Sequence, residues 1–372
     1  MRILFAPNAF KESLSARTIS GILFNNFNAL APHHQYQQFP ISDGGDGFID
    51  VLAFHKGITK SRINAQLING TFGDAEYLFD EQSGVLFTES ASLIGLKLIP
   101  APQRDVFTYD SRCLGAFIKR VCKVLEVSGK QVNKVVIGVG GTATIDLGLG
   151  ASLVLAGHNL TKPILRTDSA EVAQLLKIKE LGCPHIELVL DVKVAVMGQE
   201  DMVTEFGAQK GLKQEQTEML RHQLNELVGS LEATTGKEYR SKAMGAGGGL
   251  AVGLDALHEI SLSHSAEFVW EFLDLKSFLP NTDLVITTEG KLDRTSLLNK
   301  SVSVIESKCL EHRKPLIIIC GSAEEEVKHY LTGRGTKIFE LAGFFGGSIQ
   351  ESILHAELGL QKCVKAIYAG LK

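Results

Sequence analysis

Residues able to bind anions or metal ions gather in five short segments of the chain, each directly after a predicted strand. The segments combine glycine with carboxylate, lysine, serine or asparagine side chains, and they cover residues 8–15, 42–47, 138–146, 191–193 and 289–293. In open parallel α/β sheets, ligands bind beyond the carboxyl ends of the strands. One such segment alone would be an ordinary turn. Their repetition after successive strands predicts an active-site cleft.

The segment from Ser42 to Gly47 places two carboxylates, Asp43 and Asp46, and three glycines within six residues. The glycines let backbone N–H groups face an anion. The carboxylates could hold Mg²⁺, which takes oxygen ligands from a few carboxylates and from phosphates. A polar turn with an aspartate N-cap is the alternative, and the residues alone leave both open.

Charged side chains also stand at a predicted helix start and at a strand end. Lys11, Ser13 and Ser15 lie near a helix N-terminus, where N–H groups and the helix dipole favour a carboxylate or phosphate. A capping loop with a solvated lysine is the alternative. Asp191 ends the apolar run 186–190, so it is either a functional carboxylate or the N-cap of the next segment.

A third charged segment, 288–293, follows the apolar run 284–287. It places Glu289, Lys291 and Asp293 beside a strand end. These side chains suit a metal ion or a phosphate, and a charged surface loop is the alternative.

Two glycine-rich segments could approach a ligand closely. Residues 138–143 fit the loose G-x-G-x-x-[GA] pattern, but residues 156–163 lack the acidic residue expected of a nicotinamide site. We therefore expect a turn that approaches a substrate or phosphate. Residues 245–249 resemble a loop that closes on a nucleotide. The chain has neither a Walker A motif nor the H-R-D and D-F-G motifs of protein kinases.

The elements that must position these segments follow from hydrophobic periodicity. Strand, polar loop and helix alternate over residues 2–54, which is typical of a parallel α/β sheet. Short alternating runs with turn signals at 69–70 and 73–74 predict antiparallel hairpins over residues 62–90, the start of a second domain. We expect further strands at 35–41, 134–138, 187–191, 283–287 and 316–320, and helices at about 213–234 and 348–369.

Composition narrows the class of protein. The chain of 372 residues predicts about two domains. Its net charge of −4 gives no basic footprint, so nucleic acid is not an expected partner. No run approaches the roughly 18 apolar residues of a membrane span, and the start does not predict a secretory signal. The six cysteines form no C-x-x-C pair and suit a reducing compartment. We expect a cytoplasmic protein.

Taken in order, the segments resemble the bacterial glycerate kinase family. The resemblance extends from residue 2 to about residue 325, and the F-K-E-S-L-S motif is its most specific element. The matching segments are A-P-N-A-F-K-E-S-L-S at 6–15, D-G-G-D-G at 43–47, I-G-V-G-G-T-A-T at 137–144, F-G-A-Q-K-G at 206–211, the glycine run from Gly245, and D-L-V-I-T-T-E-G-K-L-D at 283–293.

The resemblance implies two α/β domains with the active site in the cleft between them, ATP and Mg²⁺ as cofactors, and glycerate as the substrate. One domain, with a parallel doubly wound sheet, would comprise residues 1–55 and 280–372. The other, with a mixed sheet that includes hairpins, would comprise residues 56–279. The product would be 2-phosphoglycerate rather than 3-phosphoglycerate. The oligomeric state stays open, with a homodimer as one candidate.

Roles for individual residues follow from the same resemblance. It implies that Asp191 is the base that orients and deprotonates the hydroxyl, and that Lys11 and Asp43 also have catalytic roles. Substrate contacts are implied for Ser13, Ser15, Gly44, Gly45, Asp46 and Lys210, and nucleotide contacts for Gly140, Gly141, Gly247, Gly248 and Glu289. Metal ligation is implied for Asp46 and Asp293.

The sequence also departs from the family pattern. Thr288 stands where the family usually has glycine, and Ile145 and Leu147 flank Asp146 where Asn and Gly are usual. Ala208 replaces a usual proline, and the Asn-Pro-Leu after Asp191 is absent. These changes leave two alternatives to a glycerate kinase. One is a kinase of another small sugar acid or hydroxy acid, and the other is a non-catalytic relative that binds a small anion.

Overall fold

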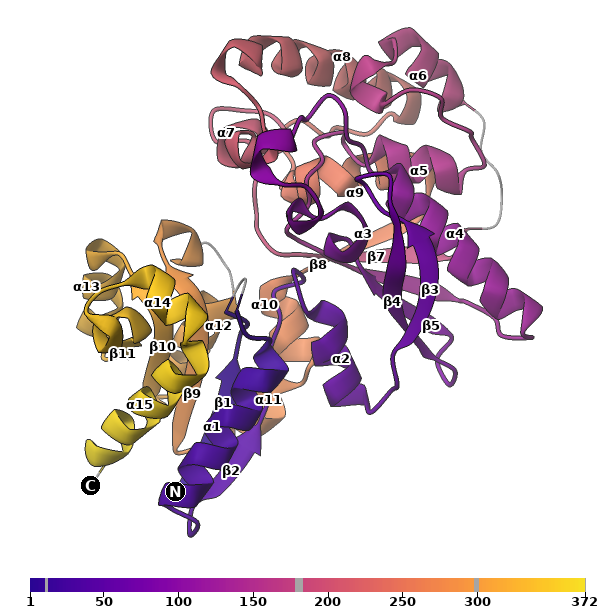
Figure 1. Cartoon of the computed structure of the whole chain (residues 1–372). Helices are drawn as coiled ribbons and strands as arrows, with labels where there is room; N and C mark the ends of the chain where they lie inside the picture. Colours follow the sequence, from indigo (N-terminus) through magenta and orange to yellow (C-terminus); the bar gives the residue numbers. More distant parts are fainter. Residues whose placement is uncertain (11–12, 178–182, 298–300, 372) are drawn as a thin grey trace. The chain divides into compact units, whose positions relative to one another are not determined.

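A computed structural model describes residues 1–10, 13–177, 183–297 and 301–371. The chain forms two compact units (Figure 1). Unit 1 comprises Met1–Gly57 and His264–Lys372, and unit 2 comprises Ile58–Ser263. Unit 1 is therefore built from both ends of the chain, and unit 2 is inserted between them.

Unit 1 contains a parallel five-stranded sheet in the order β11-β10-β9-β1-β2. Every pairing with a defined register in this sheet is parallel. Counted within the unit, the order is 2-1-3-4-5, that of a doubly wound fold whose strand order reverses between β1 and β9. The strands are β1 (Arg2–Pro7), β2 (Gln35–Gln38), β9 (Leu284–Leu292), β10 (Leu316–Ala323) and β11 (Lys337–Glu340).

Residues 3–7 of β1 and 284–289 of β9 are all buried, because helices cover both faces of this sheet. On one face, α1 and α15 pack against β1, β9 and β10 around Phe5, Phe27 and Leu360. Ser15 caps α1 by accepting a hydrogen bond from the Thr18 N–H at 3.1 Å. The helices of unit 1 are α1 (Ala16–Leu30), α2 (Phe48–Lys56), α10 (Ser265–Glu267), α11 (Leu275–Phe278), α12 (Ser301–Glu311), α13 (Glu325–Gly333), α14 (Ile349–Leu354) and α15 (Ala356–Ala369).

Unit 2 contains a mixed six-stranded sheet in the order β3-β4-β5-β6-β7-β8. The first three strands form an antiparallel meander, and β5, β6 and β7 are parallel. The predicted parallel and mixed sheets are thus both confirmed. The strands are β3 (Ser61–Gln66), β4 (Phe72–Asp80), β5 (Val85–Glu89), β6 (Lys134–Val139), β7 (His185–Leu190) and β8 (Ile260–His264).

The core of unit 2 lies between this sheet and the helices that pack on it. Leu114, Leu153 and Leu254, from three different helices, pack in the same cluster as Ile137 and Leu188 of the central strands. The helices are α3 (Ala91–Ile94), α4 (Arg112–Val127), α5 (Leu149–Leu155), α6 (Ser169–Leu175), α7 (Met202–Phe206), α8 (Thr217–Thr235) and α9 (Ala246–Leu257).

One predicted loop is in fact a strand. β9 runs on to Leu292, so Thr288, Glu289 and Lys291 belong to the sheet and only Asp293 follows it. The reason is that β9 lies between β1 and β10, and both neighbours pair with it beyond Thr287. Backbone pairing on two sides outweighs the polar composition that predicts a loop.

Three smaller predictions also differ from the structure. The turn predicted at 73–74 lies inside β4, which begins at Phe72. The strand predicted at 35–41 ends at Gln38. The single helix predicted at 348–369 is two helices, because His355 leaves helical geometry and α15 packs on α1 whereas α14 contacts β10.

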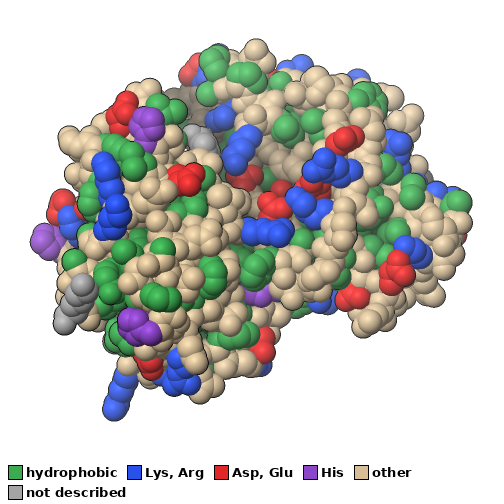
Figure 2. Space-filling model, turned by 60° about the horizontal axis from the view of Figure 1, so that its bottom comes forward, with side chains coloured by type: hydrophobic (Ala, Val, Ile, Leu, Met, Phe, Trp, Pro, Cys, Tyr) green, Lys and Arg blue, Asp and Glu red, His purple; other side chains and the backbone are tan. Residues whose placement is uncertain are grey.

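Surface properties agree with the near-neutral composition. Figure 2 shows Lys and Arg, Asp and Glu, and hydrophobic side chains interspersed over the face that it presents. Within the described residues, no helix is both long and apolar enough to cross a membrane.

Candidate active site

The strand-order reversal of unit 1 brings together the first and last of the predicted segments. Asn8, directly after β1, donates a hydrogen bond from Nδ2 to Glu289 Oε2 on β9 at 3.2 Å. The Thr288 hydroxyl donates to the Asn8 carbonyl oxygen at 2.5 Å. All three residues are buried. Because ligands of doubly wound sheets bind where the strand order reverses, Glu289 stands where a ligand contact is expected.

The segment after β2 folds as a compact turn. The Gly45 N–H donates to Asp43 Oδ1 at 3.1 Å, and the Gly44 N–H donates to Ser42 Oγ at 3.2 Å. Gly44 has a positive φ of 95°, which explains why glycine stands there. The N-cap of α2 is Gly47, with no side-chain cap, so the alternative of an aspartate N-cap is wrong. Asp43 is nonetheless engaged in the turn through one oxygen.

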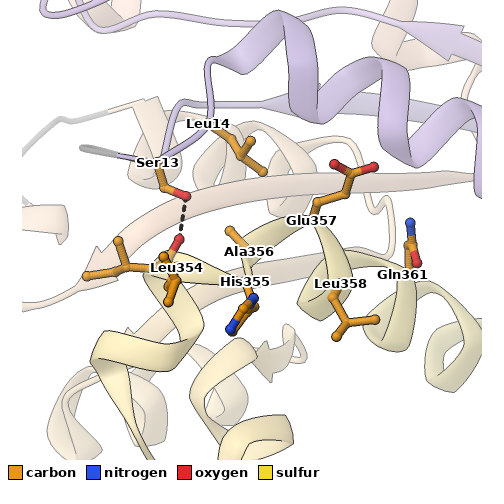
Figure 3. Close-up of a pocket in the computed structure, with 9 residues that line it drawn as sticks. Ser13, Leu14, Leu354, His355, Ala356, Glu357, Leu358 and Gln361 are labelled. Carbon is orange, nitrogen blue, oxygen red and sulfur yellow. Dashed lines mark hydrogen bonds between the residues drawn. The ribbon is translucent and has the colours of Figure 1, made fainter.

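Ser13 lies on a cavity of about 620 Å³ in unit 1, shown in Figure 3. Its hydroxyl donates to the Ile353 carbonyl oxygen at 2.8 Å, and Leu14 and His355 line the same cavity. Lys11, a predicted catalytic residue, lies outside the described residues. Both serine hydroxyls of this segment, including the capping hydroxyl of Ser15, therefore have partners within the protein.

Asp293 follows β9 and holds the next short helix. Its Oδ1 accepts from the Ser296 N–H at 3.2 Å, and its Oδ2 lies 4.0 Å from Lys291 Nζ. Lys291 also pairs with Glu324 at 2.9 Å. In the part of the chain that the structure describes, no three His, Cys, Asp or Glu side chains converge as a metal site. Because a Mg²⁺ ion carried by a nucleotide needs only one or two carboxylates, metal ligation by Asp46 and Asp293 stays a prediction.

In unit 2, the buried Lys210 contacts the predicted segment that follows β6. Its side chain is only 3% exposed. Nζ donates to Thr142 Oγ1 at 3.1 Å and to the Thr144 carbonyl oxygen at 2.8 Å, and it lies 5.7 Å from the ring centre of Phe206. Through these two hydrogen bonds, Lys210 thus holds the segment that follows β6 in place in the protein interior.

Asp191 directly follows β7, the neighbour of β6 in the sheet. Its N–H donates to the Val139 carbonyl oxygen at 3.2 Å, which holds the ends of the two strands together. The next helix, α7, is capped by Asp201, so the alternative of Asp191 as an N-cap is wrong. Asp191 is half-buried and attracts the Lys210 ammonium electrostatically.

Burial lowers the pKa of Lys210 to about 8, and the attraction of Asp191 and Asp146 offsets only part of that shift. The unfolded chain, with an ordinary lysine pKa near 10.4, therefore binds more protons than the folded chain between pH 8 and about 10. Stability gains from this group as pH rises through that window, and its slope is at most about 1.4 kcal/mol per pH unit.

We therefore predict that urea unfolding of the native chain and of Lys210→Met, followed by circular dichroism, will give free energies whose difference changes with pH. The free energy of the native chain should rise relative to the variant by a few kcal/mol between pH 8 and 10. The other lysines cancel in this comparison. Parallel curves for the two proteins would contradict the lowered pKa.

The second glycine run is shaped by packing. Gly247, Gly248 and Gly249 all have positive φ, and α9 continues from them. A Cβ on Gly248 would lie 1.9 Å from the Thr144 carbonyl oxygen, and one on Gly247 would lie 2.5 Å from Val139 Cγ1. The run therefore permits close contact with the segment that Lys210 holds, and this contact explains the glycines without a ligand. Nucleotide contacts of Gly247 and Gly248 stay a prediction.

Comparison with known proteins decides the family. The family model described as "Glycerate kinase family" matches residues 3–372. The chain belongs to the glycerate kinase family. The match reaches the end of the sequence, beyond the 2–325 covered by the recognisable motifs. The resemblance inferred from those motifs is thereby confirmed.

Named members of the glycerate kinase family match over most of their length. A glycerate kinase of Haemophilus influenzae is 30% identical over 339 residues, which cover 88% of this chain and 87% of that protein. A glycerate 2-kinase of Escherichia coli is 28% identical over 340 residues, with 88% and 87% covered. A crystal structure from Salmonella typhimurium, provisionally described as glycerate kinase 2, has the same fold, with a TM-score of 0.69, 23% identity and coverage of 100% and 99%.

The sequence predicted no role for Asp146, which lies in the segment that follows β6. It is fully buried and accepts from the Ser111 hydroxyl at 2.7 Å, the Ser111 N–H at 2.9 Å and the Gly150 N–H at 3.0 Å. Burial, with a smaller contribution from Asp110, raises its pKa, and these donors oppose the shift. Its hydrogen bonds to Ser111 could not be predicted from a local pattern, because Ser111 is 35 residues away. The only signal in the sequence was the place of Asp146 in the family motif.

Three of the departures from the glycerate kinase pattern are accommodated by the fold. Leu147, where the family has glycine, keeps a positive φ of 58°, and its side chain is buried in the core of unit 2. Ile145 is buried in the same core. Thr288 uses its hydroxyl to bind Asn8. None of the three replaces a charged group of the candidate site.

Proposed function

We propose that this protein is a cytoplasmic, ATP-dependent glycerate kinase that converts D-glycerate to 2-phosphoglycerate. The observation that supports it most is that the half-buried Asp191 ends β7 beside the end of β6, whose following segment is held by the buried Lys210, in a chain of the glycerate kinase family. A half-buried carboxylate at the end of a strand can orient a hydroxyl and accept its proton.

Phosphoryl transfer depends chiefly on positioning and on stabilising charge, with the base as a lesser contribution. Lys210 supplies positive charge behind Thr142 and Thr144, and the backbone at Gly140 and Gly141 is proposed to contact the nucleotide there. Asp191 is proposed to hold the acceptor hydroxyl and take its proton. Lys210 keeps its ammonium inside the protein, so its contribution to phosphate binding would act through the segment that it fastens.

The proposed roles in unit 1 concern the anionic groups of the substrates. Glu289 is proposed to contact the nucleotide at the strand-order reversal. Lys11 and the 13–15 segment are proposed to hold the glycerate carboxylate or a phosphate, because α1 begins there. Asp43 and the glycines beside it are proposed to contact the acceptor. Asp46 and Asp293 would hold Mg²⁺, which when bound neutralises phosphate charge.

The choice of glycerate over another hydroxy acid rests on membership of the glycerate kinase family. It also rests on the finding that the fold accommodates Thr288, Ile145 and Leu147, which depart from the family pattern, without loss of a charged group. We predict that a panel of acceptors will give the highest kcat/KM for D-glycerate, at least tenfold above other small sugar acids and hydroxy acids. Steady-state ADP release with each acceptor measures this. A higher kcat/KM for another acid would replace glycerate as the substrate, and the absence of transfer to every acceptor would favour the non-catalytic relative.

A further inference from the structure

A second cavity, of about 1010 Å³, opens in unit 2 at the opposite end of the strands from Asp191. It is lined by the C-terminal half of α4, the end of α5 and the residues just before β6 and β7, including Val132 and Pro184. The candidate active-site residues follow the other ends of β6 and β7. A strand of six residues spans roughly 20 Å, so the two sites are separate.

The rim of this cavity is strongly basic. Four cationic side chains, Lys119, Arg120, Lys123 and Lys130, line it together with one acidic residue, Glu126. The chain as a whole carries a net charge of −4, so this concentration of positive charge is local. Such a group of cations raises the local concentration of anions.

Two of these cations, Lys123 and Lys130, form only exposed ion pairs within the protein, whereas Arg120 donates a hydrogen bond to the Asn64 carbonyl oxygen at 2.6 Å. Lys123 pairs with Glu126 at 2.9 Å, but both side chains are 70% exposed. Lys130 pairs with Glu81, which is also exposed. Exposed pairs of this kind contribute about 0–1 kcal/mol. An anion with several charges can therefore displace them.

Below the rim, the lining is apolar. Ile118 and Leu155 are buried, and Val132 and Val154 are half-buried. Pockets for small molecules typically combine an apolar lining with a few polar groups that fix orientation. The lining of this cavity therefore suits a ligand that has both an apolar part and negative charges.

The thiols in the cavity do not point to covalent chemistry. Cys122 and Cys183 both line it. Burial raises the pKa of Cys122 to about 12 and that of Cys183 to about 11. Since the thiolate is the reactive form, both stay largely unreactive at neutral pH.

We propose that this cavity is a non-covalent binding site for an organic anion that carries at least two negative charges and an apolar or aromatic group. The two helices that line it also hold the segment that follows β6 at their other ends. Ser111, at the start of α4, and Gly150, in the first turn of α5, both donate to Asp146.

The test uses the dye 4,4′-dianilino-1,1′-binaphthyl-5,5′-disulfonate, which combines two sulfonates with aromatic rings, and the full-length protein. Fluorescence titration should show one saturable site per chain. In the double variant Lys119→Glu/Lys123→Glu, the Kd should rise at least tenfold. The matched control Lys337→Glu/Lys365→Glu reverses two exposed charges in unit 1 and should leave the Kd within twofold.

A second measurement needs no variant. Alkylation of the native protein at pH 9, mapped by mass spectrometry, should be slowed at Cys122 and Cys183 at least fivefold by the dye. Cys113, which is half-buried but does not line the cavity, should react as before. Equal Kd values in the two double variants, or protection of Cys113 without protection of Cys122, would overturn the proposal. Neither readout depends on kinase activity, so a failure of this proposal can be distinguished from a failure of the proposed function.

Discussion

Replacing Asp191 by asparagine is expected to lower kcat for glycerate phosphorylation by roughly 10²–10⁴-fold, the usual contribution of a general base. The amide keeps the shape of the side chain but cannot take the proton of the acceptor hydroxyl. KM for glycerate should change much less, since the effect falls on the transition state. Steady-state ADP release at saturating ATP measures both constants.

The matched control is Asp168→Asn. Asp168 caps α6 through a hydrogen bond from the Ala170 N–H at 2.8 Å, and asparagine caps helices about equally well. This variant should keep kcat within twofold. If Asp191→Asn also keeps near-normal turnover, Asp191 is not the base, and catalysis rests on positioning and charge alone.

Replacing Gly248 by alanine is expected to destabilise unit 2 by more than about 3 kcal/mol. The new Cβ would lie 1.9 Å from the Thr144 carbonyl oxygen and close to Ile145 Cα, so the backbone must move. The positive φ of 72° adds about 1–2 kcal/mol for any residue with a Cβ. Overpacking and strain together exceed the usual cost of a substitution.

Gly236→Ala is the control for backbone strain alone. Gly236 ends α8 with a φ of 69°, and no atom lies within 4 Å of the position of its Cβ. This variant should cost only about 1 kcal/mol. Urea unfolding followed by circular dichroism compares the two. Equal losses of stability would mean that the 144–145 segment gives way to the new methyl group, contrary to the close packing described here.

Local sequence patterns were sufficient to predict the central strands of both sheets, but not the edge strands β8 and β11. The apolar runs that became β1, β6 and β7 are short, continuous and bounded by glycine or polar residues. Such runs are typical of strands buried on both faces. The position of Asp191 followed from the same pattern, because a carboxylate that ends a buried run must stand at a strand end.

Contacts between distant residues explain what the sequence did not predict. Asn8 and Glu289 are 281 residues apart, and Lys210 binds Thr144 across 66 residues. Burial of a lysine leaves no local pattern, since it depends on the groups that enclose it. The extension of β9 through Glu289 has the same origin, because β1 pairs with it as far as Thr288 and β10 as far as Leu292.

The most direct test of the proposed function is a coupled ADP-release assay with Mg-ATP and D-glycerate, with the products resolved by ³¹P NMR. We predict ADP release that depends on glycerate, together with a new phosphomonoester signal at the position of 2-phosphoglycerate. A signal of 3-phosphoglycerate would contradict the choice of hydroxyl only. No glycerate-dependent ADP release, from protein shown to be folded by circular dichroism, would contradict the proposal that this chain is a glycerate kinase.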